Sequence, residues 1–316
     1  MYMNYANPKD IRILFFGTPK IAARVLSALL DASFNVAGVV CQEDKKVGRK
    51  ALLTPPPAKV IAIQNGIPCF QPHRLRLDHE FLNTISYDII VCIAYGQIIP
   101  DDVLRSAPLG AYNLHGSLLP KYRGAAPMQR ALMDGEKETG VCLMEMVSKM
   151  DAGNVFDQLS FPISLSDNYD NVYEKMGEAA SSLIVKDLLP LANGALKGKP
   201  QNEEKVTFAN KICPEEEHLP LNMTTLETHN YVRALSETPG SFVLLDGKKC
   251  KILETEPFSP NPNFKAGTLF GVGKDLCLAL KDGVLKIKRI QPEGKKPMSG
   301  HDFYNGHREV EGKTVS

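Results

Sequence analysis

The sequence has almost no net charge, since 37 lysine and arginine residues are balanced by 36 aspartate and glutamate residues over a length of 316. Net charge therefore gives no sign of a strongly basic nucleic-acid-binding protein, and any such interface has to be a local patch. Hydrophobic residues make up 43% of the chain, which is enough for a substantial core. At this length we expect two domains or one large one.

Cysteine pairs of the C-x-x-C type are also missing. The seven cysteines are scattered and odd in number, which indicates reduced, mostly buried thiols and no zinc site. No apolar run is long enough to span a bilayer, and the N-terminal segment MYMNYANPKD has no apolar stretch of the kind found in signal peptides. We therefore expect a soluble cytoplasmic protein without a bound metal.

The first half of the chain alternates apolar runs with helical patterns. Residues 11–16 (IRILFF) are continuously apolar, which is typical of a buried parallel strand. Thr18 is predicted to cap the helix that follows, and residues 35–41 complete a β-α-β unit. Residues 88–94 are the most apolar strand of all. The pattern predicts a doubly wound, mostly parallel Rossmann-like sheet. Gly17 stands alone instead of in G-x-G-x-x-G, so we expect no dinucleotide site.

The stretch NLHGSLLP, followed by KYRGAAP, is the most informative part of the sequence. It comes directly after a strand-like run and begins with Asn113 and His115, which lie two residues apart. In an extended segment such residues project from the same face. An amide donor beside a titratable imidazole suits a reaction in which negative charge develops on a carbonyl oxygen while protons move.

This stretch resembles the signature of the formyltransferases that use 10-formyltetrahydrofolate, and among them the methionyl-tRNA formyltransferases. The resemblance runs from Ile13 to about Pro162 and continues more weakly to the C-terminus. It implies a catalytic set of Asn113, His115 and a downstream aspartate, here Asp151 in a D-A-G segment. Asn113 and a protonated His115 would hold the oxyanion. Asp151 would orient His115 and stabilise its charged form, and water or His115 would pass a proton to N10 of the folate.

A folate site is predicted next to these residues. In an open α/β sheet the ligand crevice lies beyond the carboxyl ends of the strands. The backbone after residues 88–94 is a candidate wall for a flat ring, although a simple turn explains its composition equally well. Together with the resemblance, this gives the following expected folate-binding residues: Tyr95, Gly96, Gln97, Ile98, Ser117, Leu118, Leu119 and Pro120.

Residues 42–57 show no strand alternation and are rich in cations and prolines. A solvated loop is the ordinary interpretation. A mobile loop that closes over an anionic substrate is the alternative, and the segment resembles the flexible substrate loop of the family. On the second interpretation its tRNA-binding residues are Lys45, Lys46, Arg49 and Lys50.

The last third of the chain changes character. Five short strands are predicted within residues 242–290, with one helix at about 225–235, which suggests a small β-barrel of the oligonucleotide-binding (OB) type. We expect a catalytic domain at 1–193, a polar linker at 194–212 and an OB-like tRNA-binding domain at 213–316. Lys286, Lys288 and Arg289 would form a basic stripe on an exposed strand face, either solvated or bound to the tRNA backbone.

The resemblance implies transfer of a formyl group from 10-formyltetrahydrofolate to methionyl initiator tRNA, by a monomer. A formyltransferase acting on an amino sugar nucleotide, or the hydrolase half of a formyltetrahydrofolate dehydrogenase, would share HGSLLP; the GRKALLTPPPAKV segment and the C-terminal KKPMSGHDFYNGHR favour the tRNA enzyme. A catalytically silent RNA-binding module is a further alternative, against which the intact catalytic set argues. The chain has no tryptophan, whereas members of the family commonly carry some on the tRNA-facing surface.

Overall fold

The computed structural model describes residues 5–48, 51–258 and 264–316. The chain forms two compact units, each assembled from segments that are separate in the sequence. The first comprises Met1–Gly124, Glu138–Pro162 and Tyr173–Phe208, and the second comprises Ala125–Lys137, Ile163–Val172 and Ala209–Ser316.

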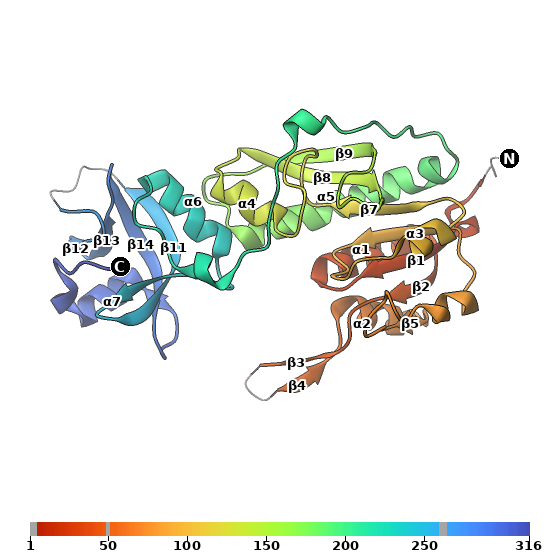
Figure 1. Cartoon of the computed structure of the whole chain (residues 1–316). Helices are drawn as coiled ribbons and strands as arrows, with labels where there is room; N and C mark the ends of the chain where they lie inside the picture. The colour runs from red at the N-terminus through yellow and green to blue at the C-terminus, as the bar shows by residue number, and fades with distance from the viewer. Residues whose placement is uncertain (1–4, 49–50, 259–263) are drawn as a thin grey trace. The chain divides into compact units, whose positions relative to one another are not determined.

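A mixed sheet forms the centre of the first unit, with the strand order β5-β2-β1-β6-β7-β8-β9 (Figure 1). The strands are β1 (Arg12–Gly17), β2 (Asn35–Val40), β5 (Cys69–Phe70), β6 (Ile89–Ile93), β7 (Ala111–His115), β8 (Glu138–Glu145) and β9 (Val155–Pro162). The strands from β5 to β7 are parallel, whereas β8 and β9 are antiparallel to their neighbours. The predicted Rossmann-like, mostly parallel sheet is confirmed, with an antiparallel pair at one edge.

The helices of this unit connect the strands. They are η1 (Pro8–Asp10), α1 (Lys20–Asp31), α2 (Pro57–Gln64), η2 (Glu80–Thr84), α3 (Asp101–Ser106), α5 (Tyr169–Ala192) and η3 (Glu203–Lys205). The prediction that Thr18 caps α1 was wrong. Its hydroxyl instead donates to the carbonyl of Tyr95 across 2.7 Å, because the end of β1 lies beside the end of β6. Among the described residues, no helix combines the length and the apolar character needed to cross a membrane.

The core of the first unit lies on both faces of the sheet. Leu14 and Phe16 of β1 pack into a cluster that includes Leu75 and Val103. Phe15, between them, is also fully buried and points to the other face, because side chains alternate along a strand. Burial on both faces explains why the strand reads as a continuous apolar run.

Residues 42–57 contain two short strands that the sequence did not predict. β3 (Lys45–Val47) and β4 (Leu52–Thr54) pair as an antiparallel hairpin, which Figure 1 shows extending from the sheet of the first unit. All the residues of both strands are exposed. Neither face is buried, so the sequence carries none of the alternation by which a strand is recognised. Arg49 and Lys50 lie outside the described residues.

Part of the segment that we expected to be a linker is bonded to the first unit. Lys199 pairs with Val155 of β9, and Phe208 forms a bridge with Arg123. Gln201 donates hydrogen bonds to the loop that carries Asp151. These contacts give a polar, proline- and glycine-rich stretch a fixed position in the first unit.

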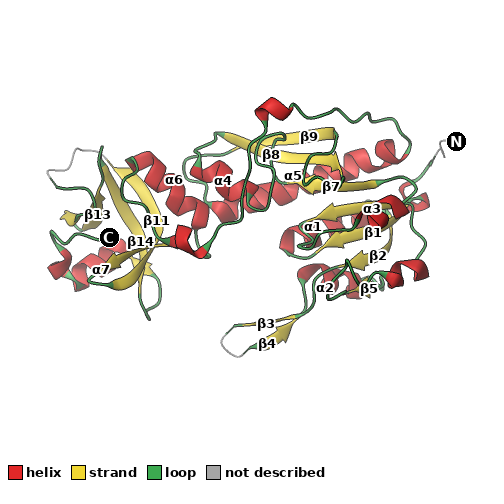
Figure 2. Cartoon of the chain, viewed as in Figure 1, coloured by secondary structure: helices red, strands yellow, loops and turns green. Residues whose placement is uncertain are grey.

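The second unit is an antiparallel sheet flanked by helices (Figure 2). Its strands are β10 (Ser241–Leu245), β11 (Lys248–Phe258), β12 (Leu269–Val272), β13 (Asp275–Ala279), β14 (Val284–Pro292) and β15 (Met298–Ser299). Its helices are α4 (Pro127–Met133), η4 (Pro214–Glu217), α6 (Thr225–Leu235), α7 (Gly300–Gly306) and η5 (Arg308–Val310).

The strand order of the second unit is β10-β11-β14-β13-β12, with β15 beside β14. α6 packs against β11, and α7 packs against β13 and β14. The predicted strands and helix are confirmed. In the described part of the chain β10 and β12 form the two edges of the sheet and do not pair with each other, so the OB-like sheet is open between them.

Candidate active site

Two of the predicted catalytic residues are placed by β7. Asn113 lies opposite Cys92 of β6, and His115 ends the strand. The two side chains share one face because they are two residues apart in an extended segment. His115 is 5% exposed, whereas Asn113 is partly exposed. Within the described residues the side-chain amide of Asn113 forms no hydrogen bond. It is therefore available to donate to a ligand.

Asp151 reaches His115 by a different route from the one that the sequence suggested. β8 is antiparallel to β7 and ends opposite Tyr112, at the far end of β7 from His115. The segment after β8 therefore has to return toward His115. It places Oδ2 of Asp151 3.6 Å from Nδ1 of His115 and 2.9 Å from the backbone amide of Gly124, which donates to it. The three predicted catalytic residues are thus brought together.

Both imidazole nitrogens of His115 face protein groups. Nε2 lies 2.9 Å from the carbonyl oxygen of Tyr122. A carbonyl only accepts, so Nε2 carries a hydrogen and donates it. Nδ1 is the other ring nitrogen, and it faces the carboxylate of Asp151. The imidazole is therefore held from two sides, by a carbonyl at Nε2 and a carboxylate at Nδ1.

Unfavourable backbone conformations cluster at this site. Ala94, Tyr122 and Asp151 have φ angles of 48°, 62° and 51°, in the left-handed region that non-glycine residues rarely occupy. Ala94 follows β6, Tyr122 supplies the carbonyl that holds His115, and Asp151 is the carboxylate partner. Such strain persists where the surrounding structure enforces it, and it concentrates at functional sites.

A buried polar network that sequence reasoning missed supports the Asp151 loop. Arg123 is 1% exposed and donates to the side-chain oxygen of Gln201 at 3.0 and 2.9 Å. The amide nitrogen of Gln201 donates in turn to the carbonyls of Asp151 and Gly153, each at 2.8 Å. The only signal in the sequence was the arginine of RGAAP, whereas Gln201 lies in a stretch that looked like a linker.

Glu203 closes the same network. It forms an ion pair with Arg123 at 2.7 Å and a second one with Lys149 at 2.9 Å. The hydrogen bond from Arg123, followed by that from Lys149, lowers the pKa of Glu203 to about 2. The Glu203 carboxylate thus accompanies the buried guanidinium, as burial of a charge requires.

The glycine of the D-A-G segment is required by close packing. A Cβ atom at Gly153 would lie 2.0 Å from the carbonyl oxygen of Glu145. No side chain can occupy that space, so the loop can approach the end of β8 only with glycine at this position.

The predicted folate-binding residues lie after the ends of the neighbouring strands β6 and β7. Several of their side chains are already engaged. The ring of Tyr95 is buried edge-on against Phe16, with centroids 5.1 Å apart. The Gln97 amide accepts from the backbone of Leu75, and the Ser117 hydroxyl donates to the carbonyl of Lys121. The side chains of Gln97 and Ser117 are thus already hydrogen-bonded within the protein, whereas the buried hydroxyl of Tyr95 has no partner in the described structure.

What remains open toward a ligand is backbone and apolar surface. Ile98 is 89% exposed. Gly96 has a φ of 93°, and a Cβ added there would meet only Gln42 atoms, at 3.7 Å or more. The Nε2 atom of Gln42 is buried and has no hydrogen-bond partner in the described structure. Gln42, which sequence reasoning did not single out, therefore has a buried donor without a partner beside Gly96.

The predicted tRNA-binding residues are spread over both units. Lys45 and Lys46 lie on the exposed strand β3. On β14, Lys286 pairs with Asp275 at 2.7 Å and Lys288 with Glu254 at 3.3 Å, and Arg289 forms an ion pair with Glu237. The acidic partners come from distant parts of the sequence, so the local composition of the stripe did not reveal them.

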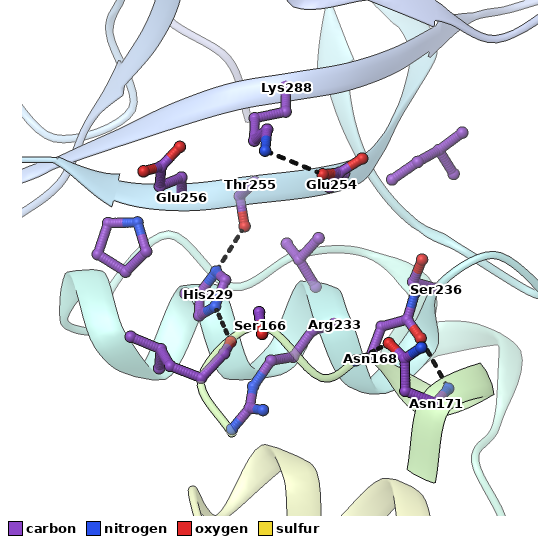
Figure 3. Close-up of a pocket in the computed structure, with 14 residues that line it drawn as sticks. Ser166, Asn168, Asn171, His229, Arg233, Ser236, Glu254, Thr255, Glu256 and Lys288 are labelled. Carbon is purple, nitrogen blue, oxygen red and sulfur yellow. Dashed lines mark hydrogen bonds and ion pairs between the residues drawn. The ribbon is translucent and has the colours of Figure 1, made fainter. Parts of the chain in front are cut away.

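The second unit contains a cavity of about 530 Å³ between β11, β14, α6 and the segment 165–171 (Figure 3). Its polar groups are mostly bonded to one another. His229 contacts the Thr255 hydroxyl and the Leu165 carbonyl, each at 3.0 Å, and burial lowers its pKa. Arg233 donates to the backbone carbonyls of Ser164 and Asp167. We interpret these contacts as structural.

Comparisons with known proteins agree with this architecture. The profile of the family described as "Formyl transferase" matches residues 10–188, and that of "Formyl transferase, C-terminal domain" matches residues 211–308. The methionyl-tRNA formyltransferase of Lactobacillus gasseri is 40% identical over 297 residues, which cover 93% of this chain and 95% of that protein. The corresponding protein of Macrococcus caseolyticus is 39% identical over 298 residues, with the same coverage.

Solved structures share the fold at lower identity. The sugar 3N-formyl transferase WlaRD, determined with dTDP and 5-N-formyl-tetrahydrofolate, superposes with a TM-score of 0.68 at 21% identity, over 90% of this chain and 99% of that one. HypX from Aquifex aeolicus in complex with tetrahydrofolic acid gives a TM-score of 0.65 at 18% identity, over 96% of this chain and 48% of that one. The profile matches and the curated relatives show that this chain belongs to the formyl transferase family.

Proposed function

We propose that this chain transfers the formyl group of 10-formyltetrahydrofolate to the amino group of methionine esterified to initiator tRNA. The observation that carries the proposal is that Asn113 and His115 share one face of β7 and that the carboxylate of Asp151 lies beside His115. Its substrate is suggested by the relatives named methionyl-tRNA formyltransferase, which match along 93% of the chain.

The geometry suits the folate co-substrate. A pteridine ring is flat and offers hydrogen-bond acceptors, and the peptide at Gly96, the exposed Ile98 and the unused donor of Gln42 form a wall of matching character. The segment Ser117–Pro120 would line the other side. The co-substrate supplies a formyl carbonyl bonded to nitrogen, which an amine can attack.

The residues of the chain would then act on charge and protons. The Asn113 amide would donate to the formyl oxygen as negative charge develops there, which is the role of a preorganised donor. The substrate amine is the nucleophile, so no covalent bond to the protein is needed. The attacking amine would lose a proton to Nδ1 of His115, with Asp151 beside it stabilising the positive charge. When the bond between the formyl carbon and N10 breaks, this proton would pass to N10, and tetrahydrofolate would leave. Tyr122 fixes the ring by accepting from Nε2.

The proposal assigns the acceptor to basic surface in both units. Lys45 and Lys46 of the hairpin would contact the tRNA near the site, together with Arg49 and Lys50. Lys286, Lys288 and Arg289 would contact it on the second unit. Their present ion pairs do not oppose this, because exposed ion pairs contribute only about 0–1 kcal/mol and exchange readily for phosphates. Residues 1–193 would carry the chemistry and residues 213–316 the tRNA contacts, in a cytoplasmic monomer.

A direct assay tests the proposal. The purified chain is incubated with 10-formyltetrahydrofolate labelled in the formyl group and, separately, with methionyl initiator tRNA, the same tRNA uncharged, a dTDP-linked amino sugar, or no acceptor. We expect labelled formylmethionine, released by base from the tRNA ester, only in the first reaction. Label on the sugar would support the runner-up activity. Release of labelled formate at the same rate with and without an acceptor would support a hydrolase. Label on the sugar or such formate release would overturn the proposal.

A further inference from the structure

Two thiols outside the catalytic set lie in contact at the edge of the first sheet. Cys41 directly follows β2, and Cys69 begins β5, the parallel neighbour of β2. Their sulfur atoms are 3.6 Å apart and share a hydrogen bond. Cys41 is fully buried, whereas Cys69 is half-buried. No other described residue pair brings two of the seven cysteines together in this way.

The two thiols differ in chemistry. The hydrogen bond from Cys41 lowers the pKa of Cys69, and the nearby ammonium of Lys59 lowers it further, against the opposing effect of burial. The same hydrogen bond, and then burial, raise the pKa of Cys41. Burial raises the pKa of three other thiols to about 12, those of Cys92, Cys142 and Cys250. Cys69 is therefore the thiol with the greatest thiolate character, which is what reactivity toward oxidants follows.

The pair is connected to the folate wall through one residue. Gln42 follows Cys41; its backbone carbonyl accepts from the Gln71 side chain at 2.7 Å, and its amide lies beside Gly96. The pairing register places Cys69 opposite Val39, two residues before Cys41, so the two cysteines are diagonal neighbours. A disulfide would shorten their sulfur–sulfur distance from 3.6 Å to about 2.05 Å. We infer that this draws Cys41 toward Cys69 and that Gln42, the next residue, moves with it.

We propose that Cys69 and Cys41 form a reversible disulfide when a peroxide oxidises Cys69, and that this bond displaces Gln42 from the folate wall. The second half of this statement rests on the proposed function. The Cys69 thiolate attacks a peroxide oxygen, the O–O bond breaks, and the leaving hydroxide takes up a proton to become water. The resulting sulfenic acid is attacked by the Cys41 sulfur, which loses its proton, and a second water leaves. Two thiols and one hydrogen peroxide thus give one disulfide and two waters.

The first experiment maps the bond and needs no activity. The reduced full-length chain is treated with hydrogen peroxide, alkylated, and digested without reductant. We expect a Cys41–Cys69 cross-linked peptide that dithiothreitol removes. Cys41→Ser should stop at a dimedone-reactive sulfenic acid on Cys69, and Cys69→Ser should give neither product. Cys213→Ser is the matched control and should behave as wild type, because the exposed Cys213 thiol contacts the Glu216 carboxylate instead of another sulfur. Absence of the cross-linked peptide in wild type would overturn the proposal.

The second experiment measures the effect on the site. Tetrahydrofolate binding is titrated for the reduced, oxidised and re-reduced chain. We expect oxidation to weaken binding by about fivefold or more and reduction to restore it, while the Cys41→Ser/Cys69→Ser double variant does not respond to peroxide. Unchanged affinity in a fully cross-linked sample would refute the displacement of Gln42. Failure of the reduced chain to bind tetrahydrofolate at all would instead count against the proposed function, which the peptide map does not depend on.

Discussion

The contact between Gln201 and the Asp151 loop offers a substitution that separates positioning from folding. In Gln201→Glu the side chain keeps oxygen atoms for Arg123, whose guanidinium gains a charged partner. What is lost are the two N–H donors to the carbonyls of Asp151 and Gly153. A carboxylate oxygen would face these carbonyls and repel them. The chain should fold, but the loop should shift away from His115.

The size of the effect follows from the bonds that are exchanged. Each of the two lost hydrogen bonds contributes about 0.5–1.5 kcal/mol, and the two carbonyls left facing a carboxylate add to the cost. The new charge-assisted contact with Arg123 offsets much of this in the free energy of unfolding. The contact with Arg123 does not restore the position of the Asp151 loop, so it does not offset the effect on the reaction rate. We expect kcat to fall by about 10- to 100-fold, which corresponds to about 1.4–2.7 kcal/mol, with the affinity for tetrahydrofolate little changed.

The assay is steady-state formylation of methionyl initiator tRNA, accompanied by urea unfolding of each variant. Gln64→Glu is the matched control, because Gln64 ends α2 on the surface and the charge change is the same. A wild-type kcat in Gln201→Glu would refute the positioning role. A loss of activity matched by a loss of folding, or seen equally in Gln64→Glu, would refute it as well.

Two further predictions concern charge. Asp187 is 3% exposed, and burial, followed by the neighbouring Asp157, raises its pKa to about 6. This folded-state pKa lies above the unfolded value near 3.9. The contribution of Asp187 to the free energy of unfolding is therefore complete below about pH 4 and is lost as the pH rises through 6. Asp187→Asn should therefore gain about 1.5 kcal/mol relative to wild type as the pH rises from 5 to 8 in urea unfolding, because part of the wild-type loss is already present at pH 5. Equal differences at both pH values would contradict this. Replacement of Lys286, Lys288 and Arg289 by alanine should lower the slope of log affinity for tRNA against log salt by about two to three if all three touch phosphates, whereas parallel lines would identify the stripe as a solvated face.

The strands and helices with one-sided or complete burial were predictable from the sequence. β1 and β6 read as continuous apolar runs because both of their faces are covered. The second unit was predicted almost strand by strand, because Asp-Gly, proline and glycine turns separate its short apolar segments. The hairpin of β3 and β4 was missed because both of its faces are exposed, which leaves no periodic signal.

The site was predictable only in part. Asn113 and His115 could be placed together, because spacing along a strand fixes the face on which side chains lie. The direction of β8 could not be predicted, because a buried strand has the same composition in either orientation. The path of the segment that carries Asp151 depends on that direction. The role of Gln201 depends on contacts across more than 70 residues with Arg123, which no local pattern contains.

The central claim is that Asn113, His115 and Asp151 together transfer a formyl group to methionyl initiator tRNA. The most direct test is the single-turnover rate of this transfer with both substrates saturating, for wild type and for Asn113→Ala, with Asn83→Ala as a control on the exposed surface. Loss of the oxyanion donor should slow the reaction by about 10²- to 10³-fold, or about 3–4 kcal/mol, while folding and tetrahydrofolate binding are retained. A correctly folded Asn113→Ala chain that transfers the formyl group at the wild-type rate would contradict the account.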